Sequence, residues 1–165
     1  LNTGIDHASN KLNAETVITM DADLTHPPRL IPELIKKMHE DDADVCIASR
    51  YVSGGGMEDV PWWRVWISVV ANFLFRLFFG IKAKDVTAGY KAYLGKHVKD
   101  LRIERPGFVV QLEIMVKLAK KKLKFTEIPL MLKNRQKGSS KFRFFKMVPR
   151  YAVQATGLFF ERWFG

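Results

Sequence analysis

The sequence predicts an α/β fold in which short buried strands alternate with longer amphipathic helices. Apolar, β-branched runs at residues 17–20 and 45–48 are typical of buried strands. Residues 29–40 and 108–121 instead repeat their apolar positions at helical spacing. Two aspartates follow the first strand directly, and the carboxyl ends of strands are where open α/β sheets bind ligands. We therefore look for function at that strand end.

Composition fits one domain with a substantial core and an anionic partner. The chain has 165 residues, of which 47% are apolar and 12% aromatic, which argues against disorder. Its net charge of +10 indicates phosphates, nucleic acid or a membrane surface as the partner. Cys46 is the single cysteine and lies in an apolar run, so we expect a buried thiol and a reducing compartment.

Residues 16–28 carry the strongest functional signal. Asp21 and Asp23 are two residues apart at a strand end, so their carboxylates share one face and can converge on a cation. Pro27 and Pro28 then end strand pairing, and Pro28 suits the first turn of a helix. The alternative is a surface turn rich in aspartate, but a buried strand before and two prolines after the pair favour a hard-metal site facing a phosphate ligand.

The rest of the chain predicts four helices and two strands. We expect helices over residues 1–12, 61–80, 108–121 and 142–165, and strands ending at residue 94 and covering residues 125–132. The helix at 61–80 is rich in tryptophan and phenylalanine, and Arg64 and Arg76 argue against a membrane span. An interfacial helix and a core helix with a polar edge both remain open for it. The basic, aromatic tail likewise fits either an anionic membrane surface or a helix that closes the core.

A series of short motifs adds a family resemblance across residues 16–141. The motifs are Asp21-Ala-Asp-Leu-Thr-His-Pro-Pro28, Ser49-Arg-Tyr51, Arg64-x-x-x-Ser68, Asp85-x-Thr-x-Gly-Tyr90, Gln111-x-Glu113, Glu127-Ile-Pro129 and Arg135-x-x-Gly-x-Ser-Lys141. In this order they resemble dolichol-phosphate mannose synthase and the related polyprenyl-phosphate sugar transferases, which are inverting enzymes of the GT-A fold. The resemblance implies a Rossmann-like mixed sheet flanked by helices, from which the first nucleotide-binding strands are missing.

The resemblance also implies an activity and a set of site residues. It implies transfer of mannose from the nucleotide sugar GDP-mannose to a polyprenyl phosphate, with Mg²⁺ or Mn²⁺ as cofactor. By position, Asp21, Asp23 and Thr25 would hold the metal, and Asp21, Asp23 and Arg135 would be catalytic. The implied acceptor-phosphate residues are Arg50, Arg64, Ser68 and Arg135, and the implied sugar pocket contains Gln111 and Glu113.

The same resemblance divides the chain and places it in the cell. Residues 1–141 would be the C-terminal part of a GT-A catalytic domain, and residues 142–165 a basic amphipathic membrane-associated tail. The protein would lie peripherally on the cytoplasmic face of a membrane with an anionic surface, and nucleic acid would not be a partner.

Three alternatives remain beside this prediction. One is a polyprenyl-phosphate glucosyltransferase that uses UDP-glucose as the donor. Asp21-x-Asp23-x-Thr25 after an apolar strand also matches the opening motif of haloacid-dehalogenase-type phosphatases, in which the first aspartate is a nucleophile. A non-enzymatic module for membrane surfaces explains the charge and the tail, but it leaves the acidic pair unexplained.

Overall fold

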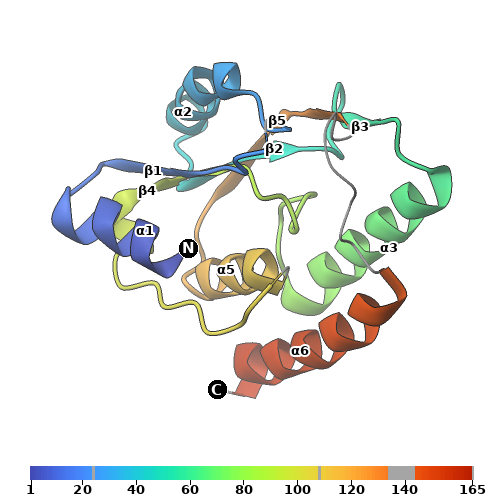
Figure 1. The fold of residues 1–165 in the computed structure, drawn as a ribbon. Coiled ribbons are helices and arrows are strands. Elements are labelled where there is room, and N and C mark those ends of the chain that lie inside the picture. Colours follow the sequence, from blue (N-terminus) through green and yellow to red (C-terminus); the bar gives the residue numbers. More distant parts are fainter. Residues whose placement is uncertain (24, 108, 134–143, 165) are drawn as a thin grey trace.

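A four-stranded mixed sheet with helices on both faces forms the centre of the molecule. The computed structural model describes residues 1–23, 25–107, 109–133 and 144–164. The strands lie in the order β1 (Thr16–Thr19), β4 (Lys91–Leu94), β2 (Val45–Ser49) and β5 (Phe125–Pro129). Figure 1 shows α2 (Ile31–Glu40) on one face, and α5 (Val109–Lys120) with α6 (Phe144–Phe164) on the other. The predicted α/β class is confirmed.

Strand direction brings four loops to one edge of this sheet. β4 runs antiparallel to β1 and to β2, and in both pairs its first residue, Lys91, is matched with a residue near the partner's carboxyl end, Thr19 or Ile47. β5 runs parallel to β2. The loops that follow β1, β2 and β5 therefore meet the loop that enters β4. The predicted metal-binding residues lie in the first of these loops.

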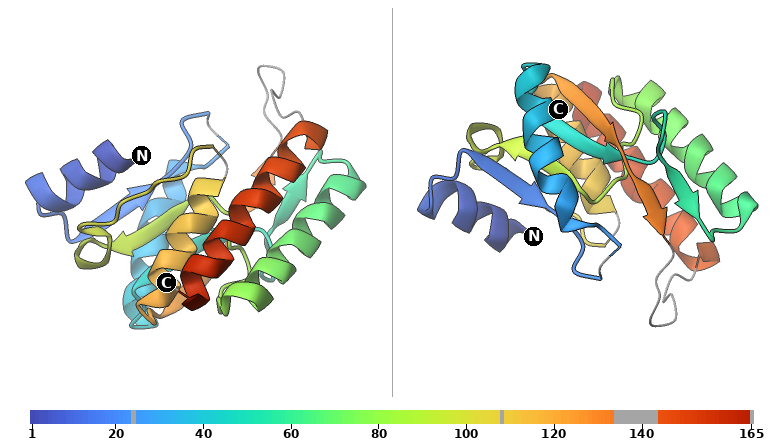
Figure 2. Two further views of the ribbon diagram at one scale, coloured as in Figure 1. Left: turned by 90° about the horizontal axis from the view of Figure 1, so that it is seen from below. Right: turned by 90° about the horizontal axis from the view of Figure 1, so that it is seen from above.

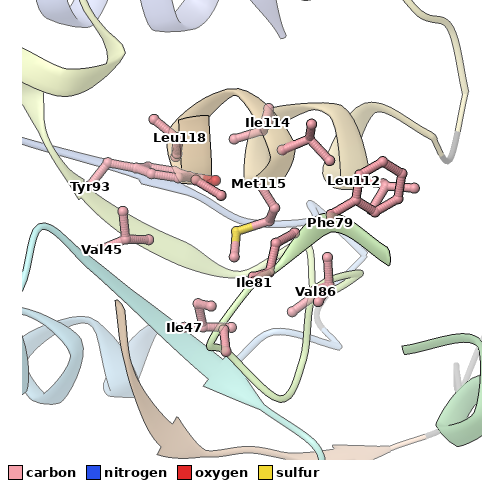
Figure 3. Packing of buried hydrophobic residues seen from close by; sticks show 14 of the residues in the cluster. Val45, Ile47, Phe79, Ile81, Val86, Tyr93, Leu112, Ile114, Met115 and Leu118 are labelled. Atoms are coloured by element: carbon pink, nitrogen blue, oxygen red, sulfur yellow. The ribbon is translucent and has the colours of Figure 1, made fainter. Parts of the chain in front are cut away.

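The core lies on both faces of the sheet because side chains alternate along each strand. Val45 and Ile47 of β2 point toward α5, where they join Tyr93, Met115 and other apolar residues, as Figure 3 shows. Residues Cys46 and Ala48 point the other way and pack beneath α2. The thiol of Cys46 is buried as predicted, and its burial raises its pKa to about 12.

Most helices lie where the sequence places them. The first predicted helix is divided into α1 (Asn2–Asp6) and a π-helical turn, η1 (His7–Lys11), and a 3₁₀ turn, η2 (Pro28–Leu30), precedes α2. α3 (Trp62–Phe79) ends at Gly80, whose φ of 65° is the left-handed conformation that glycine adopts readily. A short α4 (Gly95–Val98) after β4 is not predicted.

The single strand predicted over residues 125–132 is wrong in one respect. The segment forms β5 and then a separate strand, β6 (Met131–Lys133), which pairs with β3 (Gly56–Glu58) in a second, two-stranded sheet. Leu130 lies between the two strands: its N–H donates to Ser49 and its C=O accepts from Gly56. Both bonds are to residues far away in the sequence, so no local pattern marks the division.

Candidate functional site

The two predicted metal-binding aspartates lie just beyond the carboxyl end of β1. The side chain of Asp21 is 58% exposed, so its carboxylate faces solvent. Asp23 is half-buried, and its Oδ1 accepts hydrogen bonds from the N–H (3.1 Å) and the hydroxyl (2.6 Å) of Thr25. Thr25 therefore orients the carboxylate of Asp23 in this structure.

His26 lies beside the other carboxylate and bonds the backbone of Asp21. Its ring is buried and stacks on Tyr90 with 5.1 Å between the ring centroids. Nδ1 accepts the backbone N–H of Asp21 (2.9 Å), and Nε2 lies 3.9 Å from Oδ2 of Asp21. Burial lowers the pKa of His26 below its usual value, although Asp21 opposes this shift. The ring is therefore neutral near pH 7 and, because Nδ1 accepts, its proton is on Nε2, facing the carboxylate.

Gly89 leaves room for this arrangement. A Cβ at this position would lie 3.3 Å from His26 Cε1 and 3.5 Å from both carboxylate oxygens of Asp21. The donor set at this strand end, two carboxylates and a hydroxyl, consists of hard oxygen ligands that suit Mg²⁺ or Mn²⁺. Among the described residues, no group of three or more His, Cys, Asp or Glu side chains is arranged to hold a metal.

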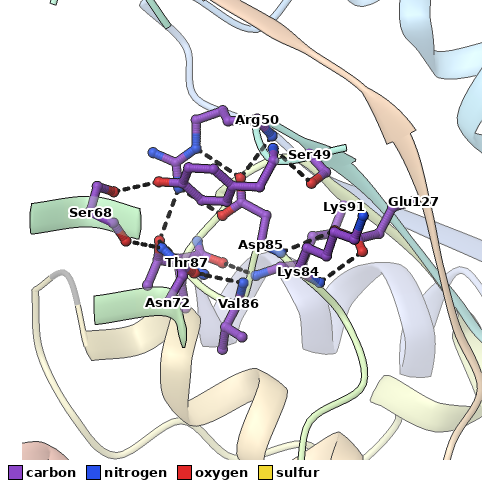
Figure 4. A network of polar contacts seen from close by, with 12 residues as sticks. Ser49, Arg50, Ser68, Asn72, Lys84, Asp85, Val86, Thr87, Lys91 and Glu127 are labelled. Carbon is purple, nitrogen blue, oxygen red and sulfur yellow. Dashed lines mark hydrogen bonds and ion pairs between the residues drawn. The ribbon is translucent and has the colours of Figure 1, made fainter. Parts of the chain in front are cut away.

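Arg50 follows β2 and is held by a buried carboxylate (Figure 4). Asp85, whose side chain is fully buried, accepts from Nε (2.8 Å), Nη2 (2.7 Å) and the backbone N–H (3.0 Å) of Arg50. Nη2 also donates to the hydroxyl of Thr87 (2.9 Å). Burial alone disfavours the charged guanidinium, but these bonds raise the pKa of Arg50 above its usual value. Three of its five N–H donors are thus used, and the two on Nη1 are bonded to none of the described residues.

The loop that carries Asp85 and Thr87 is itself fixed from two sides. The carboxylate of Glu127 in β5 accepts the backbone N–H groups of Lys84 and Asp85, at 2.7 and 3.0 Å. On the other side, the buried amide of Asn72 in α3 accepts from the backbone N–H groups of Val86 and Thr87. The motif Asp85-x-Thr87 therefore sets the position of Arg50.

The predicted acceptor residues of α3 lie on the face of that helix toward the protein. Ser68 exchanges a 2.6 Å hydrogen bond with the hydroxyl of Tyr51, the residue after Arg50. One turn earlier, the guanidinium of Arg64 lies 5.0 Å from the ring centroid of Trp63. Arg64 Nε is buried and has no hydrogen-bond partner among the residues that the structure describes. The structure thus brings Arg50 and Ser68 together through Tyr51.

The two predicted sugar-pocket residues lie on α5 and differ in environment. Gln111 accepts a 3.0 Å hydrogen bond from Lys91 Nζ, and burial lowers the pKa of this fully buried lysine to about 7. Glu113 is fully buried; it accepts the backbone N–H groups of Glu104 and Arg105 and pairs with Lys117 (2.8 Å). These bonds hold the segment before α5 in place. A sugar-binding role for Gln111 and Glu113 stays a prediction.

Arg135 lies outside the described residues.

A cavity of about 610 Å³ is found at the opposite edge of the sheet, lined by residues that include Thr16, His39 and Leu94. Thr16 begins β1 and Leu94 ends β4, so this cavity is remote from the carboxylates and Arg50. The polar residues gathered at the strand ends, and not the cavity, mark the candidate site.

Comparison with known proteins decides the family. Residues 1–102 match the sequence profile described as glycosyl transferase family 2. The chain belongs to this family. The assignment argues against the phosphatase alternative, and it confirms the family resemblance of the motifs.

Curated glycosyltransferases resemble most of this family 2 chain. It is 32% identical over 145 residues to a dolichol-phosphate mannosyltransferase of Pyrococcus furiosus, covering 87% of this chain and 40% of that protein. It is 30% identical to a polyprenol monophosphomannose synthase of Mycolicibacterium smegmatis (76% and 48% covered) and 32% identical to an undecaprenyl-phosphate mannosyltransferase of Micrococcus luteus (77% and 53%). The chain spans about half the length of these relatives.

Solved structures support the GT-A fold of this family 2 chain. A glucosyl-3-phosphoglycerate synthase from Mycobacterium tuberculosis, crystallised with Mn²⁺, UDP-glucose and glycerol 3-phosphate, matches with a TM-score of 0.58. The match covers 90% of this chain and 50% of that one at 14% identity. The same synthase with phosphoglyceric acid gives a TM-score of 0.55. The predicted mixed sheet of GT-A type, flanked by helices, is confirmed.

Sequence reasoning missed the residues that hold this site together. Asp85 and Thr87 belong to a recognised motif, but their role in fixing Arg50 depends on a contact across 35 residues. Asn72 has a weak signal: it continues the polar stripe of Arg64 and Ser68 along α3. No sequence signal marks Lys91 as a buried residue, because a lysine in a four-residue strand is usually exposed.

Proposed function

We propose that this chain provides the catalytic site of a glycosyltransferase that moves mannose from GDP-mannose to a polyprenyl phosphate, with inversion. The observation that carries the proposal is the juxtaposition of Asp21 and Asp23 with a half-buried, carboxylate-held Arg50 at one sheet edge. The names of the curated relatives support mannose and a polyprenyl acceptor. Donor and acceptor would both be anionic, in keeping with the net charge of +10.

The proposed reaction is a direct displacement. An oxygen of the acceptor phosphate attacks the anomeric carbon, and the bond between that carbon and the donor's diphosphate oxygen breaks with its electron pair. A phosphate monoester is already anionic near pH 7, so the site needs no general base to activate it. Attack on the face opposite the leaving group gives inversion.

The chain's own residues then have to hold two anions close together. Asp21 and Asp23 would hold a divalent cation, which when bound offsets the charge of the leaving diphosphate. Arg50, Arg64 and Ser68 would hold the acceptor phosphate, with Arg135 as a further predicted contact. Arg50 offers the two N–H groups of a single nitrogen, Nη1, because its other three bind Asp85 and Thr87. Its orientation is fixed before the acceptor arrives, which lowers the cost of binding.

The metal part of the proposal is tested with Asp23→Asn. This variant keeps the shape of the side chain and an acceptor for Thr25 but loses the charge. We expect its rate of transfer to fall about a hundredfold or more, in line with the loss of one charge-assisted contact at a reacting centre, about 3 kcal/mol. Wild-type transfer should also stop in EDTA and return with Mg²⁺ or Mn²⁺. Full activity in EDTA would contradict the proposed metal dependence.

The acceptor part is tested with Arg64→Ala. We expect a higher KM for polyprenyl phosphate and an unchanged KM for the nucleotide sugar, with partial recovery in Arg64→Lys, which keeps the charge but not the planar fork. Arg102, exposed and in the segment before α5, gives a matched control as Arg102→Ala. Equal effects on both substrates would contradict the assignment. Competition between GDP-mannose and UDP-glucose distinguishes the mannosyl from the glucosyl donor.

We also propose that the molecule binds an anionic membrane surface through α3 and α6. The exposed face of α3 is apolar, unlike the exposed face of a typical helix in a soluble protein. Its buried residues are Asn72 and Phe79, while Trp62, Trp66 and Leu77 are 76%, 65% and 65% exposed. α3 also has the length and mean hydropathy (1.2 over 18 residues) of a candidate membrane span. The hydrogen bonds from Ser68 and Asn72 hold its polar side on the catalytic domain, which favours a helix lying in the interface.

The carboxyl-terminal half of α6 continues this apolar surface. Figure 2 shows α6 beside α3, and Phe159 packs edge-on against Phe78 and Phe79. One face of α6 closes the core at Leu158, while Phe160, Trp163 and Phe164 on another face are exposed, which supports the proposed membrane contact.

Vesicle binding tests the membrane proposal. The protein should sediment with vesicles containing phosphatidylglycerol, and Trp66→Glu should weaken this binding. Leu12→Glu is the matched control, because Leu12 is 66% exposed and lies outside both helices. Part of the binding should be lost as salt rises, since attraction between surface charges is screened over about 10 Å at 0.1 M salt. Equal binding by Trp66→Glu and Leu12→Glu would contradict the assigned surface.

A further inference from the structure

The helix pair α3 and α6 contains buried polar atoms that lack hydrogen bonds. Among the residues with described side chains, buried side-chain nitrogen or oxygen atoms without a partner are found at Arg64 Nε, Arg76 Nε and Tyr151 OH. Buried polar groups in native proteins are nearly always bonded, because each unsatisfied group loses its hydration without compensation. Such atoms are expected where a ligand supplies the missing bond. We assign no role to Arg76.

Tyr151 lies at the amino-terminal half of α6 and points toward the protein. Its ring stacks on Phe75 of α3, with 5.5 Å between the centroids. Phe75 shares a helix face with Ser68 and Asn72, since residues four and three apart lie above one another. Tyr151 is therefore packed on the side of α3 that faces the Arg50 network, and not on the exposed apolar side.

The hydroxyl belongs to a ring packed on the same side of α3 as the Arg50 network, and the electrostatics agrees with that placement. Burial raises the pKa of Tyr151 above its usual value, and the Arg50 guanidinium partly offsets that shift. Neither the Tyr151 hydroxyl nor Nη1 of Arg50 is bonded to any of the described residues, and the two groups are not bonded to each other. Two donors held by different elements thus lie on the same side of α3 without an acceptor for either. A group with several acceptor oxygens would satisfy both.

We propose that the Tyr151 hydroxyl is a further substrate-binding group, which donates a hydrogen bond to the acceptor phosphate next to Nη1 of Arg50. The inference rests on the proposed transfer to a polyprenyl phosphate and adds a residue from α6 to that site. It also gives α6 a second role: the helix carries exposed apolar residues at one end and a phosphate-binding hydroxyl at the other.

The test is Tyr151→Phe, which removes the hydroxyl and keeps the ring on Phe75. We expect about a tenfold or larger rise in the KM for a prenyl monophosphate, as for the loss of one hydrogen bond to a charged group. The KM for the nucleotide sugar should be unchanged. The melting temperature should stay the same or rise, because no hydrogen bond within the protein is lost. Direct binding of farnesyl monophosphate, without donor or metal, should weaken by the same factor.

Tyr93→Phe is the matched control. Tyr93 is also fully buried, but its hydroxyl lies 3.4 Å from the hydroxyl of Thr19 in the sheet. This variant should keep the wild-type KM for the acceptor and melt at a lower temperature. The two substitutions are chemically identical, so opposite effects on stability and on acceptor binding separate a ligand-binding hydroxyl from a structural one.

Two results would overturn the inference. One is wild-type binding of farnesyl monophosphate by Tyr151→Phe; the other is a lower melting temperature with an unchanged acceptor KM, which assigns the hydroxyl to the fold. Failure of the proposed function is distinguishable, because the wild-type protein would then neither bind the prenyl phosphate nor respond to Arg64→Ala.

Discussion

Replacing Asp85 with asparagine tests how the site is held together. The fully buried carboxylate accepts three hydrogen bonds from Arg50, and asparagine keeps its shape but removes its charge. Removing one partner of a buried ion pair costs about 3–5 kcal/mol, because the other charge stays buried without compensation. The whole domain is stable by only about 5–15 kcal/mol. We therefore expect Asp85→Asn to lose about a fifth or more of the stability, with a melting temperature roughly 6–20 °C lower.

Urea unfolding followed by circular dichroism measures this loss, and a double-mutant cycle separates the pair from its surroundings. Arg50→Met removes the cation, and Arg50→Met/Asp85→Asn removes both charges. The double variant should be more stable than the sum of the two single losses predicts, since no unpaired charge remains buried. A loss below about 1 kcal/mol in Asp85→Asn, the value for an exposed ion pair, would refute the reasoning.

Two further predictions concern the residues next to this network. Burial lowers the pKa of Lys91 to about 7, against a usual pKa of about 10.4. Between these two pH values, Lys91 binds fewer protons in the folded state than in the unfolded state. The free energy of unfolding should therefore rise with pH over pH 7–9, by up to about 1.4 kcal/mol per pH unit. Urea unfolding at pH 7, 8 and 9 should show this slope in the wild type and not in Lys91→Met, and equal slopes would contradict a neutral buried lysine. Gly89→Ala should change the free energy of unfolding by less than about 1 kcal/mol but weaken Mn²⁺-dependent nucleotide binding in calorimetry, because its Cβ crowds His26 and the carboxylate of Asp21. Unchanged binding would mean that the carboxylate position does not matter.

The elements with a strong local pattern could be predicted from the sequence. β1, β2, α2 and α5 each have a clear apolar period, and each lies within about two residues of its prediction. The aspartate pair was found because two nearby residues share a strand end. The sequence could not predict β3, which has three residues including a glycine and gains its partner β6 from 75 residues further along the chain.

The site could be predicted in its residue types but not in its connections. The family resemblance implies that Arg50 binds phosphate, yet the structure shows most of its donors bound to Asp85 and Thr87. A sequence motif identifies a functional residue but not its hydrogen-bond partners, because packing between distant segments decides which side chains meet. Tyr151 illustrates the same limit: the stacking that buries it joins α6 to α3 across 76 residues.

The two faces of α3 connect the proposed chemistry with the proposed membrane surface. Its inward face carries Ser68 and Asn72, which hold the loop of Arg50, and its outward face carries Trp62, Trp66 and Leu77. An α-helix with its side chains is about 10–12 Å across. A polyprenyl phosphate bound to Arg50 would therefore have its phosphate about one helix diameter from a tail that lies against the outward face. The exposed apolar face of α3 would be unfavourable in water. It fits the proposed enzyme, whose acceptor has a polar head and a tail that stays in the membrane.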